Sequence, residues 1–410
     1  MEIITIGDEL LIGKTIDTNS SWIGEKMNGI GLQVRHITSI QDKKDQILNT
    51  LKTAAKRSDL VIITGGLGPT NDDITKQTLC EYFDSELTLN TNILEKIECF
   101  FLNKNLKMLD VNKDQALLPH NCDILENVRG TASGMWFEKE GVVFISLPGV
   151  PYEMKGIMNE TGLPRIKKRF SQGKVVNKTV KTHGIGESYL AEFIKEWEQK
   201  INKNDISLAY LPSPGIVKLR LTAIGEDESI LLKKIEYYTE ELNFLIPDYI
   251  YGYDKDSLES VVGDLLRKNN YSLSLAESCT GGHIAKMITS VSGCSDYFIG
   301  SVVAYSNEIK GSLLNVNQDD IKSYGAVSKE IVEQMAIGLT KKFKTDFGLV
   351  TSGIAGPSGG TKEKPVGTVW IAVAGPNRVI SKKFTFGNSR ERNIIVSSLS
   401  ALNMLRKELL

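Results

Sequence analysis

Short apolar runs alternate with amphipathic segments along the first part of the chain. The runs are rich in Val and Ile and predict strands, whereas segments with apolar residues three or four positions apart predict helices. The predicted strands cover residues 2–6, 32–38, 60–64 and 141–147, and the predicted helices cover 19–28 and 43–57. Strands that alternate with helices in this way are typical of a parallel sheet covered on both faces.

The pattern changes near residue 170, where longer strand-like segments follow each other. Strands are expected at 175–183, 206–211 and 216–224, with helices at 188–199 and 226–242. Such an order predicts a small α+β module rather than a continuation of the first sheet.

A third region begins near residue 250 and returns to the alternating pattern. Its predicted helices are 257–268, 282–289, 329–340 and 390–408, and its predicted strands are 272–276, 302–305, 347–352, 367–374 and 378–386. The chain is therefore expected to be an α/β protein of three domains, with boundaries at 1–170, 171–250 and 251–410.

Composition narrows the classes of function. A formal net charge of −1 gives no global attraction to nucleic acid or to an anionic membrane. Five scattered cysteines without a CxxC pair favour a reduced, cytoplasmic setting over a disulfide framework or a zinc cluster. The amino terminus does not have the pattern of a signal peptide, and no apolar run reaches the about 20 residues that span a bilayer.

The segment 276–282, with the sequence AESCTGG, carries the strongest chemical signal. It places Ser278 at a predicted strand-to-helix turn, where the Oγ is exposed and helix N-terminal N–H groups point at a developing oxyanion. A second cluster, Tyr305 to Lys310, can supply a base. The glycine-rich loop 352–360 lets backbone N–H groups approach a phosphate. Together these motifs predict hydrolysis of a small phosphorylated substrate.

A second candidate site follows the predicted strand 60–64. Gly65, Gly66 and Gly68 form a flexible loop suited to a phosphate, and two carboxylates, Asp72 and Asp73, come directly after it. Oxygen ligands for a divalent ion such as Mg²⁺, Mn²⁺ or Co²⁺ are expected from Asp8, Glu9, Asp17 and Asp73. The alternative is that Asp8 and Asp73 simply cap helices, as aspartate often does after a βα turn.

These motifs resemble those of the CinA family, the competence/damage-inducible proteins A. The amino-terminal motifs GDELLxGxxxDxN at 7–19 and TGGLGPTxDDxT at 64–75 are similar to the molybdopterin-binding fold. The motifs around Ser278, 305–310, 352–357 and 363–369 are similar to nicotinamide mononucleotide deamidases. The likeness covers essentially the whole chain. It implies a three-layer molybdopterin-binding-like domain, a KH-like middle domain and an α/β deamidase domain.

The resemblance also implies an activity, in which the amide of nicotinamide mononucleotide is hydrolysed to nicotinate mononucleotide and ammonia. The deamidase is expected to need no cofactor, whereas the amino-terminal domain is linked in some members to a metal-dependent ADP-ribose pyrophosphatase. A cytoplasmic homodimer is expected. The residues expected to bind substrate are Thr280, Gly281, Gly282, Ser295, Ser352, Gly353, Gly356 and Arg390.

Ser278 is the expected nucleophile, and Lys310 is its expected base. Of the four histidines only His283 lies near the motif, on a helix face that points elsewhere, and the resemblance gives it no role. A lysine has an ordinary pKa of about 10.4, so burial or a neighbouring cation must lower the pKa for Lys310 to act near neutrality. Tyr305 is expected to relay the proton or donate to the leaving nitrogen. Cys279 is the rival nucleophile, since a thiol beside a helix N-terminus can ionise.

Two other readings stay open. In one, the amino-terminal pyrophosphatase dominates and the amidase is weak. In the other, the KH-like middle binds nucleic acid during DNA uptake. A KH domain grips the nucleic-acid backbone with a GxxG loop, and the nearest candidate, GIGE at 184–187, lacks that spacing and carries an acid. Nucleic-acid binding is therefore the least favoured reading.

Overall fold

The computed structural model describes residues 1–70, 73–170 and 173–410. The chain divides into two compact units, one made of Met1–Val175 and Ile224–Glu228 and the other of Val176–Ala223 and Ser229–Leu410. The helices of the described ranges include none with both the length and the apolar character that crossing a bilayer requires.

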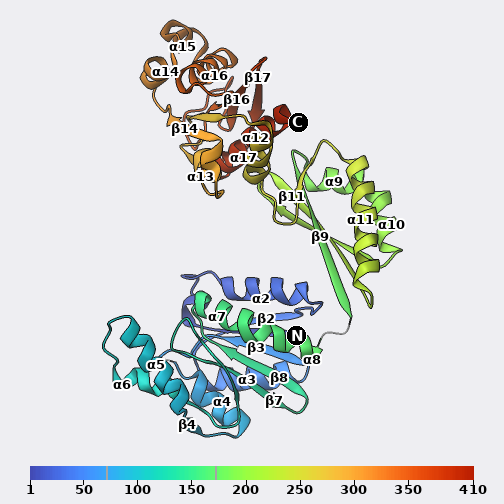
Figure 1. The fold of residues 1–410 in the computed structure, drawn as a ribbon, viewed down its shortest axis with the longest axis vertical. Coiled ribbons are helices and arrows are strands. Elements are labelled where there is room, and N and C mark those ends of the chain that lie inside the picture. Colours follow the sequence, from blue (N-terminus) through green and yellow to red (C-terminus); the bar gives the residue numbers. More distant parts are fainter. Residues whose placement is uncertain (71–72, 171–172) are drawn as a thin grey trace. The chain divides into compact units, whose positions relative to one another are not determined.

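A six-stranded sheet lies at the centre of the first unit (Figure 1). The first unit contains the strands β1 (Glu2–Ile6), β2 (His36–Ile40), β3 (Leu60–Thr64), β4 (Leu87–Leu89), β5 (Leu117–Pro119), β6 (Asp123–Leu125), β7 (Gly134–Lys139) and β8 (Val142–Leu147). The sheet order is β2-β1-β3-β8-β7-β6, and β4 pairs with β5 separately. The expected parallel pairing holds from β2 to β8. Strand β7 is antiparallel to both of its neighbours, β8 and β6. The reason is a two-residue turn at Glu140 and Gly141, whose φ angles of 52° and 82° suit a hairpin.

Helices cover both faces of this sheet. They are α1 (Asp8–Leu11), α2 (Thr18–Gly29), α3 (Lys44–Ala55), α4 (Thr75–Phe83), α5 (Thr91–Asn103), α6 (Asp110–Lys113), the turn η1 (Asp114–Ala116), α7 (Pro151–Ile157), the π-helical turn η2 (Met158–Gly162) and α8 (Leu163–Phe170). One apolar core joins the sheet to α3, α4 and α5, and another joins it to α2, α7 and α8. Strand β2 starts later than expected, because the Leu32 N–H donates to the Met27 carbonyl at 2.9 Å and extends the end of α2.

The middle of the chain forms a four-stranded sheet with helices packed against it. Its elements are β9 (Lys174–His183), α9 (Glu187–Phe193), α10 (Lys195–Asn202), β10 (Ile206–Ser213), β11 (Ile216–Gly225), α11 (Glu228–Leu245) and β12 (Ile250–Tyr253), and the sheet order is β10-β11-β9-β12. The single helix expected at 188–199 is two helices, because Ile194 leaves the helical region with φ −104° and ψ 10°. Trp197, Leu219 and Ile235 lie in its apolar core.

The last part of the chain is a second helix–sheet–helix arrangement. Its strands are β13 (Leu273–Glu277), β14 (Phe298–Val303), β15 (Phe347–Gly353), β16 (Thr368–Ala374) and β17 (Val379–Thr385), in the order β14-β13-β15-β16-β17. Its helices are α12 (Leu258–Asn269), α13 (His283–Thr289), the turn η3 (Cys294–Asp296), α14 (Asn307–Leu314), α15 (Gln318–Tyr324), α16 (Lys329–Phe343) and α17 (Arg390–Leu409). Core residues from α12, α13 and α17 cover one face of the sheet, and those from α14 to α16 cover the other.

This topology decides where the site residues meet. Strands β14, β13 and β15 are parallel, whereas β16 and β17 return antiparallel. The residues after β13, β14 and β15 therefore gather at one edge of the sheet, where ligands of α/β proteins usually bind. Strand β14 ends at Val303, earlier than expected, so Tyr305 lies in the loop beyond it and Lys310 lies on α14, a helix that the sequence pattern did not indicate.

One glycine fixes the loop at the end of β3. Gly65 has a φ of 114°, and a Cβ built there would lie 2.0 Å from the carbonyl oxygen of Ile6. We expect Gly65→Ala to lower the free energy of unfolding by about 3 kcal/mol or more, through backbone strain plus the clash. Gly141→Ala is the matched control, because Gly141 also has a positive φ but an open space around its Cβ position. It should cost only about 1 kcal/mol. Calorimetric unfolding of both variants measures the difference, and equal losses would contradict the clash.

Candidate functional site

The turn after β13 is held by one buried carboxylate. Glu277 is fully buried and accepts hydrogen bonds from the backbone N–H groups of Gly282, Ile284 and Ala285, at 3.0, 3.1 and 2.8 Å. These N–H groups belong to the start of α13, and the expectation that they face a developing oxyanion at Ser278 is wrong. Glu277 occupies that helix terminus instead, because a carboxylate neutralises the free N–H groups there.

Two other backbone N–H groups lie next to Ser278 in the same turn. The Ser278 N–H donates to the Thr351 carbonyl at 3.0 Å, which pins the turn to β15. Within the described part of the chain, the next two backbone N–H groups, those of Cys279 and Thr280, donate to no other residue. Unpaired donors beside a nucleophile are the arrangement that stabilises a tetrahedral oxyanion.

Lys310 brings its amine to the Ser278 hydroxyl from α14. Nζ lies 3.4 Å from Ser278 Oγ and donates to the carbonyls of Ala304 and Tyr305, at 2.9 and 3.2 Å. The side chain is only 1% exposed, and no carboxylate of the described residues forms an ion pair with it.

Burial without an acid favours the uncharged amine. Desolvation lowers the pKa of Lys310 below its ordinary value, because the ammonium loses its water and gains no counterion. A neutral amine has two N–H donors and one lone pair. In that uncharged form the two carbonyls can accept both N–H donors, and the lone pair can then accept the Ser278 hydroxyl proton. Ser278 itself is 8% exposed.

These residues line a pocket of about 220 Å³. Six predicted site residues meet on its wall, and they are Ser278, Tyr305, Lys310, Ser352, Gly353 and Arg390. The Arg390 guanidinium donates to the Gly356 carbonyl at 2.9 Å and to the Tyr305 hydroxyl oxygen at 3.2 Å. Arg390 thus holds the glycine-rich loop and leaves a cationic group at the pocket.

Other residues of the pocket escaped prediction. Asn307, Ala326, Val327 and Ala355 also line it. Asn307 lies inside the 305–310 motif, so its place in the site could have been predicted from the motif. Ala326 and Val327 come from the connection between α15 and α16, and their apolar side chains carry no chemical signal. The Ser352 hydroxyl donates to the Ala326 carbonyl at 2.8 Å and brings that connection to the site.

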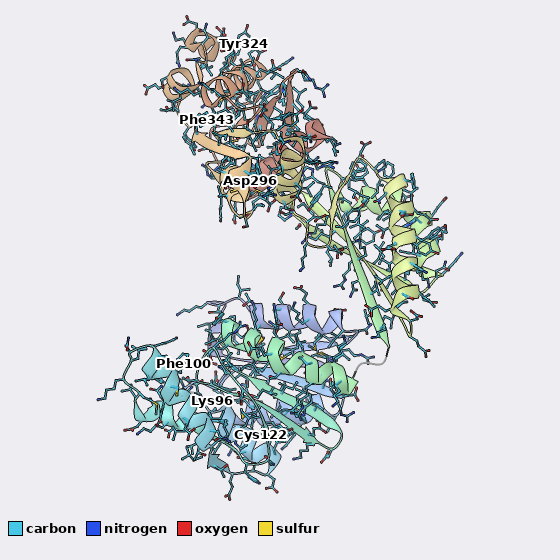
Figure 2. The ribbon with its side chains drawn as sticks, in the orientation of Figure 1. Lys96, Phe100, Cys122, Asp296, Tyr324 and Phe343 are labelled. Carbon is cyan, nitrogen blue, oxygen red and sulfur yellow. The ribbon has the colours of Figure 1, made fainter. Side chains whose placement is uncertain are left out.

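Five predicted substrate-binding residues do not line the pocket. The Thr280 hydroxyl is buried against that of Thr351 at 2.7 Å. Gly281 and Gly282 form the turn with φ angles of 61° and 94°, and Gly356 contributes only its carbonyl, to Arg390. Ser295 is exposed on η3, the turn that also contains Asp296, labelled in Figure 2.

The rival catalytic groups are differently placed. His283 Nδ1 lies 3.1 Å from the Ser398 hydroxyl on α17, so its ring faces away from the pocket, as expected. Cys279 does line the pocket but is 6% exposed, and burial raises the pKa of its thiol to about 12. A thiol with that pKa is protonated at neutral pH, and the thiol is a poor nucleophile.

In the amino-terminal unit, tight packing explains the predicted glycine loop. A Cβ on Gly66 would lie 2.1 Å from Thr75 Oγ1, and one on Gly68 would lie 2.5 Å from Asp73 Oδ2. A small pocket of about 100 Å³ lies at this edge of the sheet, with Glu9, Asp17 and Asn19 among its lining residues. Asn19 Nδ2 donates to the Thr64 hydroxyl and to the Gly149 carbonyl, at 3.0 and 2.8 Å.

Of the predicted metal ligands, Glu9 and Asp17 line this small pocket, whereas Asp8 and Asp73 do not. Asp17 caps α2 by accepting from the Ser20 N–H, and Asp73 accepts from the N–H and the hydroxyl of Thr70. Asp8 and Glu9 are exposed on α1. Asp72 lies outside the described residues. Among the residues that are described, no group of three His, Cys, Asp or Glu side chains is placed to hold a metal ion, so they do not fit the expected divalent site.

A larger cavity of about 680 Å³ lies elsewhere in the first unit. It runs along α5, and Lys96 and Phe100, both labelled in Figure 2, lie on its wall. Lys96 pairs there with Glu126 at 2.6 Å. None of the predicted site residues lines this cavity.

Comparison with known proteins defines the class of the chain. Residues 2–168 match the probable molybdopterin binding domain, 177–252 the damage-inducible protein CinA KH domain, and 255–409 the CinA C-terminal domain. The fold is therefore a three-domain combination of these types, as predicted.

Full-length relatives then identify the family. A CinA-like protein of Cytophaga hutchinsonii is 49% identical over all of this chain and 97% of its own length. A putative competence-damage inducible protein of Caldicellulosiruptor saccharolyticus is 41% identical over all of this chain and 99% of its own. The solved competence/damage inducible protein CihA of Agrobacterium tumefaciens is 34% identical, covering 37% of this chain and 93% of its own with a TM-score of 0.36. The chain belongs to the CinA family.

The buried state of Cys279 makes a prediction that does not depend on activity. Iodoacetamide at neutral pH should alkylate the exposed Cys99 well before Cys279, because the Cys279 thiol is buried and stays protonated. Peptide mass spectrometry of the native protein over time measures both rates. Unfolding in urea is the control and should make the two cysteines react alike. Early modification of Cys279 in the native protein would restore it as a candidate nucleophile.

Proposed function

We propose that the carboxyl-terminal domain hydrolyses the amide of nicotinamide mononucleotide to nicotinate mononucleotide and ammonia. The observation that carries this proposal is the Lys310 amine, buried without an acid and 3.4 Å from the Ser278 hydroxyl. A base and a nucleophile in contact, next to unpaired N–H donors, suit acyl transfer from an amide.

The reaction proceeds through an acyl-enzyme. Lys310 takes the hydroxyl proton as Ser278 Oγ attacks the amide carbon, and the Cys279 and Thr280 N–H groups stabilise the oxyanion. The protonated Lys310 then gives its proton to the nitrogen as the carbon–nitrogen bond breaks and ammonia leaves. A water molecule, deprotonated by the same amine, attacks the ester carbon. Lys310 returns that proton to Ser278 Oγ as the carbon–oxygen bond breaks, which releases nicotinate mononucleotide and restores the serine.

The rest of the substrate is placed by the shape and charge of the pocket. Its 220 Å³ is below the range of about 300–1,000 Å³ that is usual for small-molecule sites, so it suits the nicotinamide ring better than the whole nucleotide. The ribose and phosphate then extend toward Arg390, whose guanidinium is a bidentate partner for phosphate. Tyr305, which is bound to Arg390, belongs to phosphate or ribose recognition in this arrangement rather than to proton transfer.

For the amino-terminal domain, the described residues support no metal-dependent step. The expected ADP-ribose pyrophosphatase needs a divalent ion beside a diphosphate. The carboxylates that we expected to hold that ion are exposed, used within the fold, or outside the described ranges. The small pocket at Glu9, Asp17 and Asn19 suits binding of a compact polar ligand.

Substitution of the paired residues should abolish the amidase. We expect Ser278→Ala and Lys310→Met each to lower the rate of ammonia release from nicotinamide mononucleotide by about 1,000-fold or more, because each removes one half of the activated nucleophile. Cys279→Ser is the matched control in the same turn and should keep most of the activity. A coupled ammonia assay measures all three. Full activity of Ser278→Ala would eliminate the acyl-enzyme.

The dependence on pH should follow the state of Lys310. Its pKa is lowered, and only the deprotonated amine accepts the serine proton, so kcat/KM should fall as the pH drops through that lowered pKa. Activity should already be present well below the ordinary lysine pKa of about 10.4. A pH profile of ammonia release provides the measurement. Lys310→Arg should be inactive at every pH tested, because a guanidinium does not deprotonate there. A profile that rises only near pH 10 would contradict a buried neutral amine.

A further inference from the structure

A second and larger cleft lies within the second compact unit. It has a volume of about 800 Å³ and is bounded on one side by the end of β9 and the β10–β11 hairpin, and on the other by β17 and the start of α17. The packing below it is firm, since a Cβ on Gly215 of the hairpin would lie 3.4 Å from Leu399 and from Val396 of α17. The glycine-rich segment 184–186 forms part of its wall.

One polar group on this wall has no partner. His183 lines the cleft and is 7% exposed, and its Nδ1 makes no hydrogen bond among the described residues. Its backbone N–H donates to the Tyr249 carbonyl at 2.9 Å, so this hydrogen bond holds the backbone but gives the ring Nδ1 no partner. A buried polar atom without a partner is costly, and the ring that carries this atom lies on the wall of the cleft, where a bound ligand is the nearest source of a partner.

Two aromatic rings offer a flat apolar surface to the same cleft. Phe384 on β17 and Phe386, directly after that strand, are half-buried, with ring centroids 5.6 Å apart and planes at 11° to each other. Both line the cleft, together with Ile185 and Ile216. Half-buried aromatic rings of this kind stack well on planar heterocycles.

An anion-binding group completes the cleft. Ser389 caps the 20-residue α17 and accepts from the Arg392 N–H, whereas the N–H groups of Arg390 and Glu391 make no hydrogen bond among the described residues. The Arg392 side chain is exposed on the cleft wall and forms no ion pair within the described chain. Free N–H groups at a long helix start, with a guanidinium beside them, attract phosphate.

We propose that this cleft binds a free nucleotide that carries at least one phosphate. The base lies on Phe384 and Phe386, its polar edge reaches His183, and the phosphate lies at Arg392 and the α17 N-terminus. The Glu187 carboxylate, also on the wall, is an acceptor for ribose hydroxyls. That acid disfavours a polynucleotide backbone, so the ligand is a single nucleotide rather than a nucleic acid.

The segment 387–389, which lines the cleft, directly precedes Arg390 in the chain. Asn393 Nδ2 donates to the Gly387 carbonyl at 2.8 Å and to the Ala355 carbonyl at 2.9 Å, which ties this loop to the glycine-rich loop of the pocket near Ser278. The cleft and the pocket have no lining residue in common, and Asn393 links the two loops that lie beside them.

AMP is the probe that tests this site, in the full-length protein. Photolabelling with 8-azido-AMP should mark peptides that contain 183–187 or Phe384–Phe386. Calorimetric titration with AMP should show that Arg392→Glu weakens binding about tenfold or more, from the loss of a charge-assisted hydrogen bond. Lys383→Glu removes a neighbouring exposed cation that does not line the cleft, and it should leave the affinity unchanged.

Several outcomes would overturn the proposal. These are the absence of heat or label at millimolar AMP, label confined to peptides around Ser278 or the amino-terminal unit, and equal losses in Arg392→Glu and Lys383→Glu. Tighter binding of a short single-stranded oligoadenylate than of AMP, with the same dependence on Arg392, would also overturn it in favour of nucleic acid. None of these readouts uses the deamidase reaction, so a failure of that function leaves the test intact.

Discussion

The Glu277 carboxylate is the interaction on which the carboxyl-terminal site depends. A charge that is fully removed from water must be satisfied by the protein, and here three backbone N–H groups of the α13 start do so. The bonds close the turn around Ser278 and keep its conformation independent of any substrate. The N–H groups of Cys279 and Thr280, in the same turn, donate to no other residue of the described chain.

Parallel strands explain how distant segments reach that turn. Ser278, Tyr305 and Ser352 follow or end β13, β14 and β15, which lie side by side in the sheet. Arg390 comes from much later in the chain, and α17 brings it to the same edge. The pocket thus needs no residue from the amino-terminal or middle domain, whereas the larger cleft is built from both the middle and the carboxyl-terminal domains.

The sequence predicted the elements whose residues carry a periodic or chemical pattern. The strands at Glu2–Ile6 and Leu60–Thr64 are continuous apolar runs and appear at the predicted positions. Lys310 and Ser278 were paired from their motifs together with the family resemblance that these motifs carry. The two free N–H donors were missed, because the Glu277 side chain competes for the helix terminus and no spacing rule reveals that. Ala326 and Val327 were missed because small apolar residues enter a site only through tertiary packing. The acids of the amino-terminal motif were expected to converge, but local caps hold Asp17 and Asp73 instead.

The lowered pKa of Lys310 has a consequence for folding as well as for chemistry. In the unfolded chain this amine titrates at its ordinary value of about 10.4, whereas the folded state gives up the proton at a lower pH. Folding therefore releases that proton, and the unfolded state binds more protons throughout the window between the lowered pKa and the ordinary one. Conformational stability gains from each rise in pH within that window. Burial of the Lys310 amine, which suits it to activate a serine, therefore lowers the conformational stability of the protein below the ordinary lysine pKa.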